Sequence, residues 1–120
     1  MACWQTGYAR RLAAYRLHAL PAWRSPAATR IELAQGSREK ADLARLKKGL
    51  AARRTEIMPI TPAISARAAA LIDALALSHG TRLAAALIGA TAIATHATLI
   101  TVSDRHFSAV EGLTFEAYLP

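Results

Sequence analysis

The residue best placed to do chemistry in this sequence is Asp104. It follows residues 98–102, TLITV, a short run rich in β-branched side chains that is typical of a buried parallel strand. Residues 103–106, SDRH, are polar and favour a turn. Ligands of open α/β sheets bind at the carboxyl ends of the strands. Asp104 is therefore the first candidate for a ligand-binding or catalytic carboxylate.

Glu32 is the second acidic residue of interest, and it lies in the segment TRIELAQG at 29–36. Thr29 is expected to cap a short helix that Gly36 ends. A glutamate in the first turn of a helix is most often a favourable partner of the helix dipole. The residues alone therefore give Glu32 a structural role.

The sequence does not support other catalytic arrangements. The four histidines lie in separate predicted elements, without the i,i+4 pairing that a zinc site on one helix requires. They are His18, His79, His96 and His106. Neither a serine-centred elbow nor a glycine-rich phosphate loop occurs in the sequence.

Hydrophobic periodicity predicts the elements that must position these side chains. Helices are expected at 5–20, 29–36, 38–53, 62–78 and 82–95, and strands at 23–27, 56–60, 98–102 and 113–118. The clearest boundaries are Thr61-Pro62, an N-cap followed by proline, and Gly80, which ends the same helix. Ser37 is expected to cap the helix at 38–53. Helices that alternate with short strands predict an α/β fold with a parallel sheet and right-handed crossovers.

Composition places the 120 residues in one globular domain with an uneven charge. Residues 1–54 carry 12 Lys and Arg against three acids, whereas residues 55–120 carry three against five. The basic half is consistent either with binding to a polyanion or with a solvated surface, and charge alone does not separate the two. The single cysteine, Cys3, excludes a disulfide framework and favours a reducing cytoplasm.

Residues 83–103 contain no Lys, Arg, Asp or Glu over 21 positions, a length that can span a bilayer. The segment is dominated by Ala and Thr, and its pattern divides into a helix and a strand. It is therefore expected to be buried core, with no membrane association. The N-terminal residues contain no apolar stretch typical of a secretory signal.

Three matches in order connect the sequence with a known family. They are TRIELAQG at 29–36, LAAALIGATA at 83–92, and the residues Leu99-Ile100-Thr101 with Arg105-His106-Phe107. These segments resemble PIN-domain proteins, particularly VapC-type toxin ribonucleases, whose motif reads roughly L-x-D-A-L-I-A-A-T-A followed by L-L-T-x-N-x-x-H-F. The resemblance implies a PIN-like three-layer α/β fold over residues 1–120, with a short parallel sheet flanked by helices. Residues 1–21 would replace or truncate the usual first strand and helix, so the first strand is shortened or missing.

The resemblance also implies a metal site, because acidic residues of the family hold Mg²⁺ or Mn²⁺. Glu32 matches one acidic position, and Asp104 lies beside another, where Ser103 replaces the usual Asn or Asp. No acidic residue precedes Glu32, and Ala85 stands at the central aspartate position. Magnesium needs only one or two carboxylates. Glu32 and Asp104 are thus the expected metal ligands and catalytic residues, and the missing acids predict weak metal binding and weak catalysis.

By this resemblance, the chain is a VapC-like toxin of a type II toxin–antitoxin pair, a Mg²⁺-dependent endoribonuclease that is weakened or inactive. Its implied partners are a VapB-like antitoxin, RNA and a second copy of the chain in a homodimer. The alternative is a catalytically dead PIN-like domain that only dimerises or binds an antitoxin. A basic helical RNA-binding module is a third possibility, and the ordered motif matches count against it.

Overall fold

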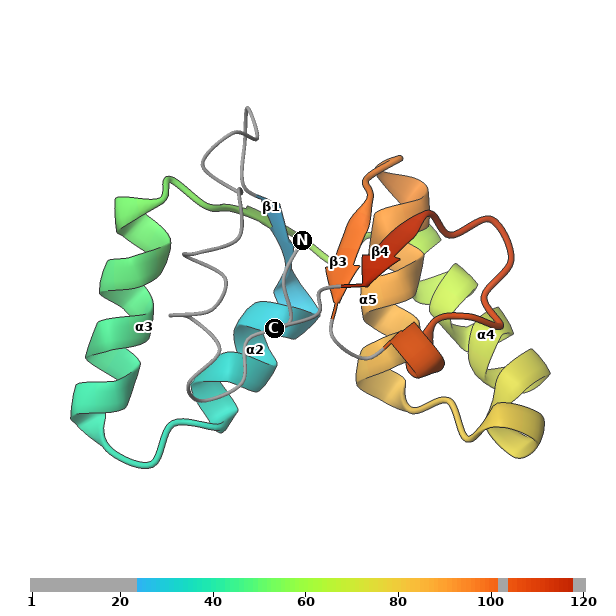
Figure 1. Cartoon of the computed structure of the whole chain (residues 1–120), viewed down its shortest axis with the longest axis horizontal. Coiled ribbons are helices and arrows are strands. Elements are labelled where there is room, and N and C mark those ends of the chain that lie inside the picture. The colour runs from blue at the N-terminus through green and yellow to red at the C-terminus, as the bar shows by residue number, and fades with distance from the viewer. Residues whose placement is uncertain (1–23, 102–103, 118–120) are drawn as a thin grey trace.

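A computed structural model describes residues 24–101 and 104–117, apart from the side chain of Asp104. Within these residues the chain alternates helices and short strands, as predicted (Figure 1). The elements are β1 (Arg24–Pro26), α2 (Ala27–Gln35), α3 (Lys40–Ala52), β2 (Glu56–Met58), α4 (Pro62–His79), α5 (Leu83–Ala94), β3 (Leu99–Thr101), a 3₁₀ turn (Asp104–His106) and β4 (Phe115–Ala117). The helix predicted at 5–20 and the replaced first strand within 1–21 lie outside the described residues.

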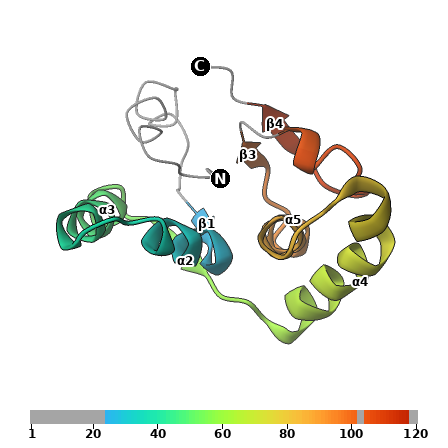
Figure 2. The same ribbon diagram turned by 90° about the horizontal axis from the view of Figure 1, so that it is seen from below.

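The strands pair in parallel, as the alternation of helices and strands predicts. β1 pairs with β2, where Ser25 lies opposite Ile57, and β3 pairs with β4, where Leu99 lies opposite Phe115. In the described part of the chain these pairs form two separate two-stranded sheets. Figures 1 and 2 show α2 and α3 on one side of the strands and α4 and α5 on the other. The three-layer α/β architecture is therefore confirmed.

Helix α4 has the boundaries that its local sequence predicts. The hydroxyl oxygen of Thr61 accepts a hydrogen bond from the backbone N–H of Ile64 at 3.2 Å, and Pro62 occupies the first helical position, where no intrahelical donor is required. Gly80 ends the helix at φ 65°, and its N–H donates to the carbonyl of Ala76. Both ends of α4 are thus determined by residues adjacent in sequence.

The predicted caps of α2 and α3 are wrong. Helix α2 begins at Ala27, directly after Pro26, so Thr29 lies inside the helix and is buried. Helix α3 begins at Lys40, with Glu39 in the N-cap position, and the Ser37 hydroxyl donates back to the carbonyl of Leu33 in α2. Just before α3, the backbone N–H of Arg38 donates a hydrogen bond to the carboxylate of Asp42 at 3.1 Å.

Helix α5 occupies the centre of the fold and is buried on two faces. Ala86 and Ala90 face α4, where they form a cluster with Ile64 and Ala68. The opposite face meets the strands in the main core cluster, whose buried members are Ala28, Met58, Ile88, Ala92, Leu99 and Phe107. Small side chains permit this close approach of helices. Residues 86–92 and 99–101 thus form core helix and strand, as predicted, whereas Leu83 at the start of α5 is 69% exposed. Among the described residues no helix is long and apolar enough to cross a bilayer.

Candidate functional site

The two candidate acids belong to segments that leave the carboxyl ends of two parallel strands. Helix α2, which carries Glu32, follows β1 directly, and the 3₁₀ turn that begins at Asp104 follows β3 after two residues. Figure 1 shows β1 and β3 running in the same direction, with α2 and the turn at the same end of the molecule. This end, defined by α2, the turn and the start of α5, is called the strand-end site below. It is where ligands bind in open α/β sheets.

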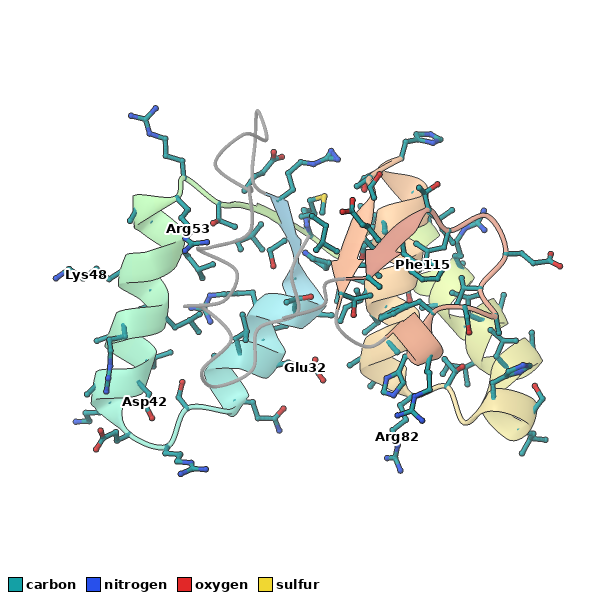
Figure 3. The ribbon with its side chains drawn as sticks, in the orientation of Figure 1. Glu32, Asp42, Lys48, Arg53, Arg82 and Phe115 are labelled. Carbon is teal, nitrogen blue, oxygen red and sulfur yellow. The ribbon has the colours of Figure 1, made fainter. Side chains whose placement is uncertain are left out.

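Glu32 lies on an exposed surface of α2 and is not a partner of the helix dipole. Because α2 begins at Ala27, Glu32 falls in the second turn, and the first turn contains no acidic residue. Stabilisation by the dipole falls off within the first turn. The prediction of a first-turn position is therefore wrong. Figure 3 shows the Glu32 carboxylate on the side of α2 that faces α5, the helix against which α2 packs.

Ala85 is the third residue of α5 and faces the protein interior. It is half-buried and packs against the main core cluster defined above. Its methyl group contributes apolar contact at this position and provides no oxygen that can bind a cation.

The described side chains do not fit a centre built from several carboxylates. No group of three or more His, Cys, Asp or Glu side chains in the described part of the chain is close enough to hold a metal ion. The undescribed residues 1–23, 102–103 and 118–120 contain neither Asp nor Glu. The described side chains therefore do not by themselves form a divalent-metal centre built from a cluster of acids.

Two further acids are held elsewhere on the molecule by ion pairs. Arg45 contacts Glu39 at 3.9 Å and Asp42 at 3.1 Å, both on or beside α3. Figure 3 shows Asp42 on α3, far from Glu32 on α2. Asp73 is exposed on α4, in the other helical layer. The two ion-paired acids on and beside α3 are therefore not part of the strand-end site.

Cationic groups at the strand-end site are a feature that the sequence analysis did not single out. Arg82 is the residue before α5, and it is exposed, as is Arg105 in the 3₁₀ turn. Figure 3 shows Arg82 at this end of the molecule, pointing outward. A single arginine between two predicted helices gives no distinctive sequence signal of such a role. Cations at the mouth of a site favour the approach of an anionic substrate.

The family of the chain follows from a match over most of its length. The family model described as "PIN domain" matches residues 7–113, and the chain belongs to the PIN domain family. The parallel strands and the flanking helices agree with the fold that the resemblance implies. PIN domains are generally divalent-metal-dependent nucleases.

Two solved structures are similar to the chain in fold. One is VapBC2 from Rickettsia felis, described as bound to a DNA fragment from its promoter, with a TM-score of 0.74 and 22% identity over 96% of this chain and 87% of that chain. The other is a toxin–antitoxin complex from Klebsiella pneumoniae, with a TM-score of 0.67 and 25% identity over 88% of this chain and 82% of that chain. No curated protein matches the sequence significantly.

Proposed function

We propose that the chain is a VapC-like toxin that binds a VapB-like antitoxin. The observation that carries this proposal is the fold similarity to a VapBC complex over 96% of the chain, together with the PIN domain match to residues 7–113. An antitoxin needs the surface of the PIN fold to bind, and it does not need an intact set of metal ligands. The proposed binding partner is therefore compatible with the loss of acidic residues. A cytoplasmic location is part of the same proposal.

The enzymatic part of the proposal is Mg²⁺- or Mn²⁺-dependent endoribonuclease activity that is weakened or absent. Glu32 and Asp104 are the proposed metal ligands and catalytic residues, since their segments leave parallel strands at the same end of the fold. The half-buried Ala85, which lacks a ligand atom, is the reason to expect low activity. A site with fewer carboxylates holds a divalent cation less tightly and neutralises less of the charge on the transferring phosphoryl group.

Cleavage of mixed cellular RNA by the purified chain tests this part. The reactions contain Mg²⁺ or Mn²⁺, and a parallel set contains a chelator. Glu32→Gln and Asp104→Asn are compared with Asp73→Asn, which removes the same kind of charge from the outer face of α4. Slow, chelator-sensitive cleavage that both site variants abolish and Asp73→Asn retains is the expected result for a weakened enzyme. Cleavage that is unaffected by Glu32→Gln and Asp104→Asn would contradict the assignment of these residues.

A second candidate function is favoured by the absence of a carboxylate cluster among the described side chains. In this case the chain is a catalytically dead PIN domain that binds an antitoxin or forms a homodimer. Co-purification with a VapB-like protein encoded beside it measures the first interaction, and light scattering of the chain alone measures the second. Antitoxin binding without detectable RNA cleavage would select this candidate. Cleavage abolished by Glu32→Gln would exclude it.

A further inference from the structure

Helix α3 presents a basic outer face, and most of its cations form no ion pair with a described residue. Its inner face is apolar, with Leu50 buried and Leu43 and Leu46 half-buried. The outer face carries four exposed cations separated by exposed alanines, and we call it the α3 basic face. Its cations are Lys40, Arg45, Lys47 and Lys48. Figure 3 shows Lys48 pointing away from the body of the protein, whereas Arg53 points inward.

The acids next to α3 neutralise only one of these cations. Glu39 and Asp42 both pair with Arg45, and Asp42 also accepts a hydrogen bond from the backbone of Arg38. In the described part of the chain, Lys47 and Lys48 form no ion pair. Local helix electrostatics do not account for them either, because neither lies in the last turn, where the dipole favours cations. These lysines therefore remain available to an external anion.

The composition of the α3 basic face favours a polyanion over a protein partner. Protein interfaces are built around buried aromatic or aliphatic anchors, and lysine is depleted in them. This face has only alanine between its cations and no aromatic side chain. It also has no Asn, Gln, Ser or Thr that could read a base edge. Contacts to phosphate oxygens need only positive charge, and the small alanines let a backbone approach closely.

The length of the face matches the charge density of a nucleic acid. The 13 residues of α3 span roughly 20 Å at 1.5 Å per residue, and duplex nucleic acids carry about one charge per 1.7 Å of axis. Several phosphates thus lie within reach of the helix. We propose that the α3 basic face binds the phosphate backbone of RNA, without base specificity and without a divalent cation. The choice of RNA as the polyanion rests on the proposed function. The α3 basic face is observed in the structure and does not depend on that proposal.

The consequence for the protein is that RNA binding and RNA cleavage are separate properties. Binding at α3 depends on lysine charge and is retained whether or not Glu32 and Asp104 hold a metal. The outcome of a binding measurement in chelator is therefore independent of the proposed ribonuclease activity and of the antitoxin. The binding test can therefore be interpreted even if the protein has no ribonuclease activity or binds no antitoxin.

The test is fluorescence anisotropy of a short labelled single-stranded RNA of mixed sequence, in chelator, across a range of salt concentrations. Each phosphate contact to a single strand contributes a slope of about 0.7 in log affinity against log salt, which corresponds to roughly fivefold in affinity at about 0.1 M salt. Lys48→Ala is expected to lose about fivefold and Lys47→Ala/Lys48→Ala roughly 25-fold. Alanine is the best helix former, so α3 should stay folded, which circular dichroism verifies. Lys48→Arg is expected to bind like the original chain.

The matched control is Arg67→Ala, which removes one exposed charge from α4, in the opposite helical layer. It is expected to leave the salt slope unchanged. An equal loss for Arg67→Ala and Lys48→Ala would overturn the proposal, because only net charge would then matter. No binding by the original chain at low salt, or tighter binding of duplex DNA than of RNA at the same salt, would overturn it as well.

Discussion

Replacing Ala85 with aspartate is the most informative perturbation of the strand-end site. Ala85 is the third residue of α5, and α5 packs against α2, which carries Glu32. The first turn of α5 contains no acidic residue, so a new carboxylate there gains about 0.3–1 kcal/mol from the helix dipole. Aspartate loses up to about 0.7 kcal/mol of helix propensity relative to alanine. These two effects oppose each other, so in chelator their sum is expected to change the free energy of unfolding of Ala85→Asp by less than about 1 kcal/mol. Burying part of the aspartate side chain adds a separate cost.

Magnesium should stabilise this variant by mass action. If the new carboxylate completes a site with Glu32 and Asp104, Mg²⁺ at ten times its Kd raises the free energy of unfolding by about 1.4 kcal/mol. For a domain of this size, such a change raises Tm by about 5 °C. The original chain has one carboxylate fewer at this position and is expected to show a smaller shift.

The assay is thermal unfolding followed by circular dichroism, with MgCl₂ against NaCl of the same ionic strength. Ala74→Asp, on the exposed face of α4, adds the same charge outside the site and should show no magnesium-specific shift. Adding Glu32→Gln to Ala85→Asp should remove the gain. A folded Ala85→Asp variant whose Tm responds to Mg²⁺ no more than that of Ala74→Asp would refute the alignment of Ala85 with an acidic ligand position.

Four further substitutions test the stability of the scaffold and are measured by urea unfolding. Thr61→Ala removes the acceptor for the Ile64 N–H and should lower the free energy of unfolding by about 1 kcal/mol, whereas Thr61→Ser should retain it. Gly80→Ala places a side chain at φ 65° and should cost about 1 kcal/mol. Gly49→Ala lies inside α3 with nothing within 4 Å of the added methyl group, and it should raise the free energy of unfolding by about 0.5–1 kcal/mol. Equal effects of Gly80→Ala and Gly49→Ala would contradict the role of the positive φ at Gly80. Leu99→Ala removes a core side chain that is 1% exposed and should cost about 2–5 kcal/mol, so a loss below about 1 kcal/mol would refute its place in the core.

Local sequence was sufficient where a structural signal involves neighbouring residues. The N-cap Thr61 and the C-terminal Gly80 of α4 are such signals, and both were predicted correctly. The starts of α2 and α3 were not, because their capping candidates make contacts of a different kind. Thr29 is buried within α2, and the Ser37 hydroxyl donates back to the preceding helix. A candidate cap can be recognised from its residue type, but its hydrogen-bond partner depends on the path of the chain on both sides.

The sequence proposed members of the candidate site, and the structure was needed for the arrangement of their segments. The family resemblance selected Glu32 and the segment around Asp104, and the structure places α2 and the 3₁₀ turn at the same end of the fold. The exposed Arg82 beside α5 was missed, since a single arginine between two helices has no distinctive pattern. The second-turn position of Glu32 also required the structure, because it depends on where β1 ends.

The sequence by itself determined which side chain each position has available. Alanine stands at position 85, so no folding of this chain can place a carboxylate there. Tertiary structure alone decided where the remaining charges lie. Parallel pairing of Ser25 with Ile57 and of Leu99 with Phe115 joins residues far apart in the chain. Such pairings form only when the whole core packs around α5. In the packed structure, Glu32 lies at the strand-end site and the lysines of α3 are exposed to solvent.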